Sequence, residues 1–96
     1  MSEAGIAVIR LGERFDFQAY RTFREAYEQE LAKAEIQVLI IDLQAVQYID
    51  SAALGILLLL RDKAQAQHKR VELRSLHGIA KEVFEVANFQ KLFKIS

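Results

Sequence analysis

The sequence predicts an α/β fold with a mostly parallel four-stranded sheet and about three helices. Three observations support this prediction. Short apolar runs typical of strands alternate along the chain with amphipathic stretches of helical period. One run, Val38 to Ile41, is apolar at every position, which is typical of a strand inside a parallel sheet. The chain of 96 residues is 52% apolar, so we expect one domain over residues 1–96 built on a single core.

The first half of the chain has a strand, helix, strand pattern. Ile6 to Leu11 is a short β-rich run that ends at Gly12, and Asp16 then lies where a helix N-cap is expected. Val38 to Ile41 indicates a strand covered on both faces, which Asp42 ends before a loop over residues 44–49. Between the two strands, apolar residues at three- and four-residue spacing predict one buried helix face: Tyr20, Phe23, Tyr27 and Leu31, widened by Ala19, Ala26 and Ala34.

The second half predicts two more helices and two more strands. Asp50 or Ser51 caps a helix that runs to about Gln67, and its first half is apolar nearly all round, so it is buried on most sides or meets a partner. Val71 to Leu76 alternates as a half-exposed strand does. The last helix is predicted over residues 79–87, with one apolar face made of Ile79, Ala80, Val83, Phe84 and Ala87. Asn88 is expected to be its left-handed C-cap. We expect Phe89, Leu92 and Phe93 to pack back on the core and residues 94–96 to form an edge strand.

Composition excludes several classes of function. Lys and Arg balance Asp and Glu at 13 each, so we expect no binding to nucleic acid or to an acidic membrane. The chain has no cysteine, which removes disulfides, thiolate metal sites and thiol catalysis. Two unclustered histidines make a metal site improbable, and we expect no cofactor. The longest apolar run, Ala52 to Leu60, is too short to span a bilayer, so we expect a cytoplasmic protein.

Ser51 is the residue with the most specific chemistry. It follows Asp50 and opens a helix, where unpaired backbone N–H groups and the helix dipole favour phosphate. Small neighbours at Ala52, Ala53 and Gly55 would let another protein approach closely. The residues alone leave two readings open, because Asp50 and Ser51 are also common helix caps, and a cap is the more frequent role.

Three stretches of the chain resemble one known family. The stretch Val38 to Gly55, VLIIDLQAVQYIDSAALG, resembles the signature of the STAS domain family, the anti-sigma factor antagonists, in which a helix opens with Asp-Ser-Ser/Thr-Gly-Leu-Gly. LGERFDF at residues 11–17 resembles the family's turn and acidic position before the first helix. FEVANFQKLFKI at residues 84–95 resembles its helix-loop-strand ending. The resemblance therefore covers nearly the whole chain.

The resemblance implies a phosphorylation switch. Ser51 matches the serine that a partner serine kinase phosphorylates in such antagonists, and Asp16 matches the acidic position near it. Unphosphorylated antagonists capture an anti-sigma factor or a related serine kinase, phosphorylation ends the capture, and a PP2C-type phosphatase restores it. The residues expected to contact the partner are Asp16, Asp50, Ala52, Ala53, Leu54 and Gly55. A monomer or weak dimer is expected.

The chain departs from the family pattern in two places. Ala52 and Ala53 replace the family's second Ser/Thr and Gly, so Ser51 is the only hydroxyl at the start of the helix. The sequence stops at Ser96, where many members continue into a further strand end and helix, so we expect the C-terminal helix of the family to be absent.

Two other functions compete with the switch. In the first, the chain is a STAS-like structural subunit that stabilises an ATPase of a transport complex, and Ser51 is a contact that is never modified. In the second, Ser51 and His77 belong to a hydrolase, but the chain has no Gly-x-Ser-x-Gly elbow and no evident oxyanion hole. We therefore predict no catalytic residue and a binding module that is not an enzyme.

Overall fold

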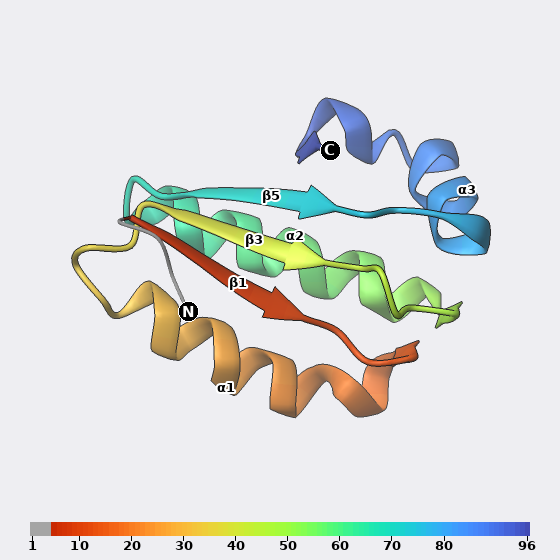
Figure 1. Cartoon of the computed structure of the whole chain (residues 1–96), viewed down its shortest axis with the longest axis horizontal. Coiled ribbons are helices and arrows are strands. Elements are labelled where there is room, and N and C mark those ends of the chain that lie inside the picture. Colours follow the sequence, from red (N-terminus) through yellow and green to blue (C-terminus); the bar gives the residue numbers. More distant parts are fainter. Residues whose placement is uncertain (1–4) are drawn as a thin grey trace.

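A four-stranded parallel sheet forms the centre of the computed structural model, which describes residues 5–96 (Figure 1). Its strand order is β1-β3-β5-β6, and each neighbouring pair is parallel. The strands are β1 (Ile6–Arg10), β3 (Val38–Asp42), β5 (Arg70–Arg74) and β6 (Lys94–Ile95). This confirms the predicted α/β fold.

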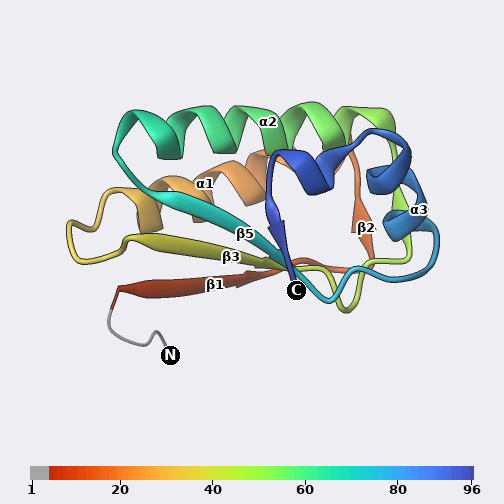
Figure 2. The same ribbon diagram turned by 90° about the horizontal axis from the view of Figure 1, so that it is seen from above.

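The three α-helices of residues 5–96 lie on the same side of this sheet (Figure 2). They are α1 (Tyr20–Leu31), α2 (Ser51–Ala66) and α3 (Gly78–Val86), and two short 3-10 turns precede α1 and follow α3, η1 (Phe17–Ala19) and η2 (Phe89–Lys91). Each of the first three strands of the sheet leads toward the next helix, so the carboxyl ends of the strands and the starts of the helices gather at one end of the molecule.

The core lies between the sheet and the helices. Alternate strand residues point toward the helices and are buried: Ala7, Leu39, Ile41, Val71 and Leu73. They pack against the inner faces of α1 and α2. Phe23 of α1 stacks edge to face with Phe15, which precedes the helix, and with Tyr27, at ring-centroid distances of 5.2 and 5.3 Å. Each large side chain buried here contributes roughly 1.5–3 kcal/mol of hydrophobic stabilisation.

Three details of the predicted helices are wrong. Ile79 is 59% exposed, although the pattern placed it on the buried face of α3, because it lies about 100° round the helix from the buried Ala80. Ala34 lies beyond the end of α1 at Leu31 and is exposed. Asp16 caps η1 rather than α1, so the regular helix begins four residues later than the cap.

The C-terminal segment largely follows the prediction. Asn88 adopts the left-handed conformation with φ of 60°, as a C-cap does. Phe89 and Phe93 pack into the core, whereas Leu92 is partly exposed. The last strand pairs with β5 over only two residues.

A second, very small sheet lies where a loop was predicted over residues 44–49. β2 (Arg14–Phe15) pairs in parallel with β4 (Tyr48–Ile49), and the amides of Gln47 and Tyr48 donate to the Glu13 carbonyl at 2.8 and 3.0 Å. A ladder of two residues has too few positions to show a period in the sequence. This pairing is what positions the candidate site.

The prediction that β3 is covered on both faces is half right. Val38, on the face away from the helices, is only 8% exposed, yet it is not part of the core cluster. Among residues 5–96 no helix covers that second face (Figure 2). Val38 is therefore buried without a helix on that face.

Candidate functional site

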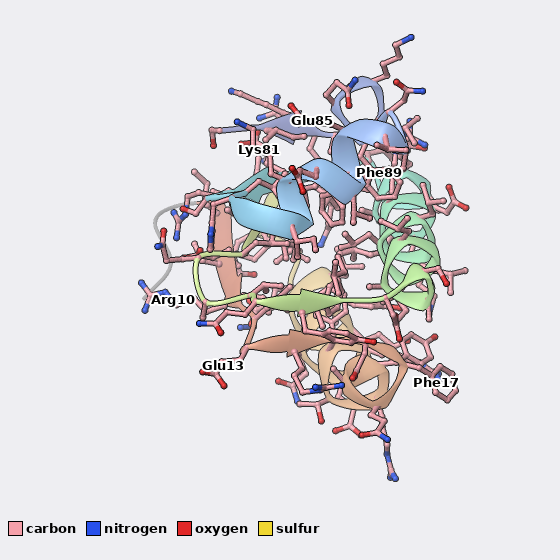
Figure 3. The ribbon with its side chains drawn as sticks, turned by 90° about the vertical axis from the view of Figure 1, so that its right-hand side faces the viewer. Arg10, Glu13, Phe17, Lys81, Glu85 and Phe89 are labelled. Atoms are coloured by element: carbon pink, nitrogen blue, oxygen red, sulfur yellow. The ribbon has the colours of Figure 1, made fainter. Side chains whose placement is uncertain are left out.

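The small sheet brings two predicted site residues together at the start of α2. β2 and β4 run side by side with Phe15 opposite Ile49, so the residues that follow, Asp16 and Asp50, occupy the next position of the same pairing. Ser51 follows Asp50 as the first residue of α2. Figure 3 views this end of the molecule, with the paired strands in front and Phe17 beside the starts of α1 and α2.

Asp50 is the N-cap of α2. Its backbone is extended, and its Oδ1 accepts a hydrogen bond from the Ala53 amide at 3.1 Å. Its Oδ2 accepts from the Phe17 amide at 3.4 Å, which ties the start of α2 to η1. Of the two candidate caps, Asp50 therefore does the capping. Within residues 5–96 the Ser51 side chain is exposed and has no hydrogen bond, so its hydroxyl is free for other chemistry.

Asp16 holds the neighbouring turn. Its Oδ1 accepts from the Ala19 amide at 3.2 Å, and its Oδ2 pairs with Arg14 Nε and Nη2, each at 3.2 Å. The Arg14 guanidinium also lies 4.4 Å from the centroid of the Tyr48 ring, within cation–π range. The site thus has two carboxylates and one arginine, and the arginine is fixed against the more buried carboxylate.

The first turns of α2 divide the remaining predicted contacts into surface and core. Gly55 is exposed, and a Cβ added to it would meet nothing within 4 Å. Ala52 and Leu54 are half-buried. Ala53 is fully buried, so its side chain offers no surface to a partner. Ser51 and Gly55 lie one helical turn apart on the exposed face, where another backbone could approach closely.

Sequence reasoning missed the exposed apolar side chains around this site. Phe17 is 70% exposed beside Asp50, and Tyr48 is exposed on β4 next to Arg14. Leu58 and Leu59 are exposed on the next turns of α2 after Gly55. For Leu58 and Leu59 the signal was the apolar run at the start of α2, which predicted a helix that is buried on most sides or meets a partner, without naming these residues.

The hydrolase reading has no geometric support. His77 Nε2 lies 2.7 Å from the Gln44 carbonyl oxygen, so the ring links two loops rather than activating a nucleophile. Over residues 5–96 no His, Asp and Glu side chains group as they would around a metal ion. Nor does any helix in that range have the length and apolar character to cross a membrane.

Comparisons with known proteins agree with this architecture. Residues 2–96 match the STAS domain model. A STAS-domain containing protein from Pseudomonas aeruginosa is 40% identical over 88 residues, which cover 92% of this chain and 85% of that protein. Both values are high enough to establish common family membership.

Solved structures share the fold at low identity. The anti-sigma factor antagonist SpoIIAA in its unphosphorylated form superposes with a TM-score of 0.76 at 20% identity, over 100% of this chain and 83% of that chain. A sulfate transporter family protein from Wolinella succinogenes gives a TM-score of 0.82 at 12% identity, over 99% and 79% of the two chains. The match over residues 2–96 and the 40% identical relative together show that this chain belongs to the STAS domain family.

Proposed function

We propose that this chain is a cytoplasmic anti-sigma factor antagonist of a partner-switching pathway, with one STAS domain over residues 1–96. STAS domains are generally not catalytic, which fits a protein that acts by binding. The observation that carries the proposal is the division of roles at the start of α2. Asp50 provides the cap, and the exposed Ser51 hydroxyl has no hydrogen bond within the described chain.

In the unphosphorylated state, the exposed face of α2 receives the partner. Gly55 allows close backbone approach, while Phe17, Leu58 and Leu59 supply apolar contact area around Ser51. The partner is an anti-sigma factor or a related serine kinase. Asp16 is buried and paired with Arg14, so its charge is balanced within the chain and the contact is mainly apolar.

Phosphorylation of Ser51 reverses the binding preference. A phosphoryl group adds about −1.5 to −2 charges, which the first-turn amides of α2 and the helix dipole accommodate. The same charge lies next to Asp50 in sequence and in the middle of the contact surface, so it repels the partner's acidic groups and separates the two apolar surfaces. A PP2C-type phosphatase then restores the binding form.

The solved structures of SpoIIAA describe a similar protein and not this chain. SpoIIAA is described as an anti-sigma factor antagonist and has also been solved in a phosphorylated form, which superposes on this chain with a TM-score of 0.75 at 19% identity. At that identity the likeness supports the fold, and the switch rests on the geometry of Ser51.

The test combines mass analysis with binding. The chain is incubated with ATP and each serine kinase of the anti-sigma type encoded in its host, and intact mass with peptide mapping locates the phosphate. We expect one phosphate on Ser51, none on Ser75, and none in Ser51→Ala. Ser51→Asp should bind the regulator at least about tenfold more weakly than Ser51→Ala, a difference of about 1.4 kcal/mol. Equal affinity of the two variants, together with no phosphate on Ser51, would support a structural subunit instead.

A further inference from the structure

The face of the sheet opposite the helices is the feature that the proposed function leaves unused. Parallel sheets are normally covered on both faces, because their connections place helices on each side. Here the three α-helices all lie on one side (Figure 2). The other face, which we call the open face, is formed by the alternate strand residues that point away from the core cluster.

The strand register arranges the open face in three rows. Across β1 and β3 the rows are Ile6 with Val38, Val8 with Ile40, and Arg10 with Asp42. The first two rows are entirely apolar. Val8 is 37% exposed although it lies in a regular strand, Ile6 and Ile40 are half-buried, and Val38 is 8% exposed at the centre of the patch. On β5 the same rows continue with Arg70, Glu72 and Arg74, so charged side chains border the apolar patch on that side.

We propose that the open face binds the open face of a second copy of this chain, about a two-fold axis parallel to the strands and midway between β1 and β3. This operation places β1 of one copy over β3 of the other without changing the row. Ile6 then lies over Val38 of the second copy, and Val8 over Ile40. Arg10 lies over Asp42, and each contact occurs twice. The rows are therefore self-complementary in both polarity and charge.

Other two-fold arrangements of the same face are not complementary. An axis along β3 places β1 over β5, which sets Arg10 against Arg74 and Ile6 against Arg70. An axis perpendicular to the strands reverses the rows, which sets Asp42 over the apolar Val38. Only the axis between β1 and β3 pairs apolar with apolar and cation with anion in every row.

The charged row is already organised within one copy. Asp42 Oδ2 lies 3.1 Å from Arg74 Nη2 and 3.7 Å from Arg10 Nε, and its Oδ1 accepts from the Gln44 amide at 2.9 Å. A second copy would bring one more arginine to each Asp42, closing a network of alternating charge. Because several bonds fix the carboxylate, it is a preorganised partner for that arginine.

The size of the patch sets the strength of the association. Two strands of three rows bury much less than the roughly 800 Å² per partner of a standard interface, so the dimer is weak and depends on concentration. Arg10 and Phe17 lie on opposite sides of the molecule (Figure 3), so pairing of the open faces leaves the exposed face of α2 uncovered. A dimer would then present two copies of the Ser51 surface. This inference does not depend on the proposed function.

Sedimentation velocity on the full chain tests the proposal. We expect the weight-average sedimentation coefficient of the wild type to rise between about 20 µM and about 1 mM. Val8→Lys places an ammonium group in the apolar rows and should weaken association at least about tenfold. Val86→Lys is the matched control, because Val86 is 85% exposed on α3, away from the open face, and this variant should associate as the wild type does. Circular dichroism confirms that both variants are folded.

A second variant and a second measurement test the same dimer independently. Arg10→Glu sets like charges face to face in the third row and should also weaken association, and the Arg10 side chain is 82% exposed, so the fold tolerates the change. In wild-type NMR spectra, concentration should shift the amides of β1 and β3 and leave those of α3 unchanged. A wild type that stays monomeric at about 1 mM, or a dimer that survives both Val8→Lys and Arg10→Glu, would overturn the proposal.

Discussion

At the scale of single residues, the start of α2 shows what a sequence can and cannot decide. Asp and Ser are both good helix caps, so the pair Asp50-Ser51 is consistent with either residue in that role. The backbone decides between them, because Asp50 is extended and its carboxylate accepts from Ala53, whereas Ser51 is already helical. The two side chains can therefore be tested for different functions.

We predict that the free energy of unfolding depends on the Asp50 side chain and not on that of Ser51. Asp50→Ala removes the cap and the bond from the Phe17 amide, so it should lower the free energy of unfolding by about 1 kcal/mol. Ser51→Ala removes no hydrogen bond of the described chain and should change it by less than about 0.5 kcal/mol. Urea unfolding followed by circular dichroism measures both. A larger loss in Ser51→Ala than in Asp50→Ala would show that Ser51 has the structural role.

Tyr27 gives a second prediction at this scale. It is fully buried against Phe23, and its hydroxyl is the one buried side-chain polar atom in residues 5–96 without a hydrogen bond. Burial raises the pKa of Tyr27 above its ordinary value, although the nearby Lys63 opposes this. Because the unpaired hydroxyl is costly, Tyr27→Phe should leave stability unchanged or raise it by up to about 1 kcal/mol.

The same unfolding measurement on Tyr48→Phe provides the control for Tyr27. Tyr48 is 45% exposed on β4, so removing its hydroxyl should have little effect. A clear loss of stability in Tyr27→Phe alone would mean that the Tyr27 hydroxyl has a partner, for example a buried water.

At the scale of elements, predictability followed the length of the hydrophobic pattern. The inner face of α1 was predicted because apolar positions recur over several turns. The β2–β4 pairing was missed, because two residues show no period and their partners are 34 positions apart in the register. Ala34 and Ile79 were misplaced because they lie at helix ends. The apolar spacing in the sequence extends past the last residue of α1 and includes the first turn of α3, so it does not locate the ends of the buried faces.

Gly55 connects the stability of α2 to its proposed binding role. Glycine inside a helix is destabilising relative to alanine, and a Cβ at Gly55 would meet nothing within 4 Å. We therefore expect Gly55→Ala to raise the free energy of unfolding by about 0.5–1 kcal/mol. The added methyl group would also project from the surface proposed to receive the regulator, so the variant should bind more weakly while being more stable.

The control for Gly55→Ala is Gln65→Ala, which changes an exposed position near the other end of α2. It should alter neither stability nor binding to a measurable extent, because both residues favour helices and the position is far from Ser51. Isothermal titration calorimetry with the regulator separates the two effects. Unchanged binding of Gly55→Ala would place the contact elsewhere on the chain.

At the scale of the whole molecule, the sheet has one covered face and one open face, and this could not be derived from the strand sequences. The run Val38 to Asp42 is buried on both faces, which usually indicates helices on both sides. Here no helix of residues 5–96 covers the second face, and Asp42 joins the ends of β1, β3 and β5 through Arg10 and Arg74. In the sequence Asp42 indicated only the end of a strand.

Because Asp42 joins three strands, the stability of the whole fold should depend on its charge. Burial raises the pKa of Asp42, but the Gln44 amide and the neighbouring Arg74 outweigh that effect, so the pKa lies below the ordinary value of 3.8. Between the folded and unfolded pKa values, the unfolded chain binds more protons, and stability rises with pH. The contribution of Asp42 is therefore fully present above about pH 5 and is lost as the pH falls below about 4, through the lower pKa of the folded state.

Urea unfolding of the wild type and of Asp42→Asn between pH 7 and roughly pH 3 measures this dependence. Asp42→Asn should be less stable than the wild type at pH 7, and the difference should shrink toward the acid end, because the wild type loses its carboxylate there and the variant has none to lose. Asp62→Asn, at an exposed carboxylate on α2, should run parallel to the wild type at every pH. A difference between wild type and Asp42→Asn that stays constant with pH would show that the Asp42 charge does not hold the strand ends together, and that the variant acts through packing alone.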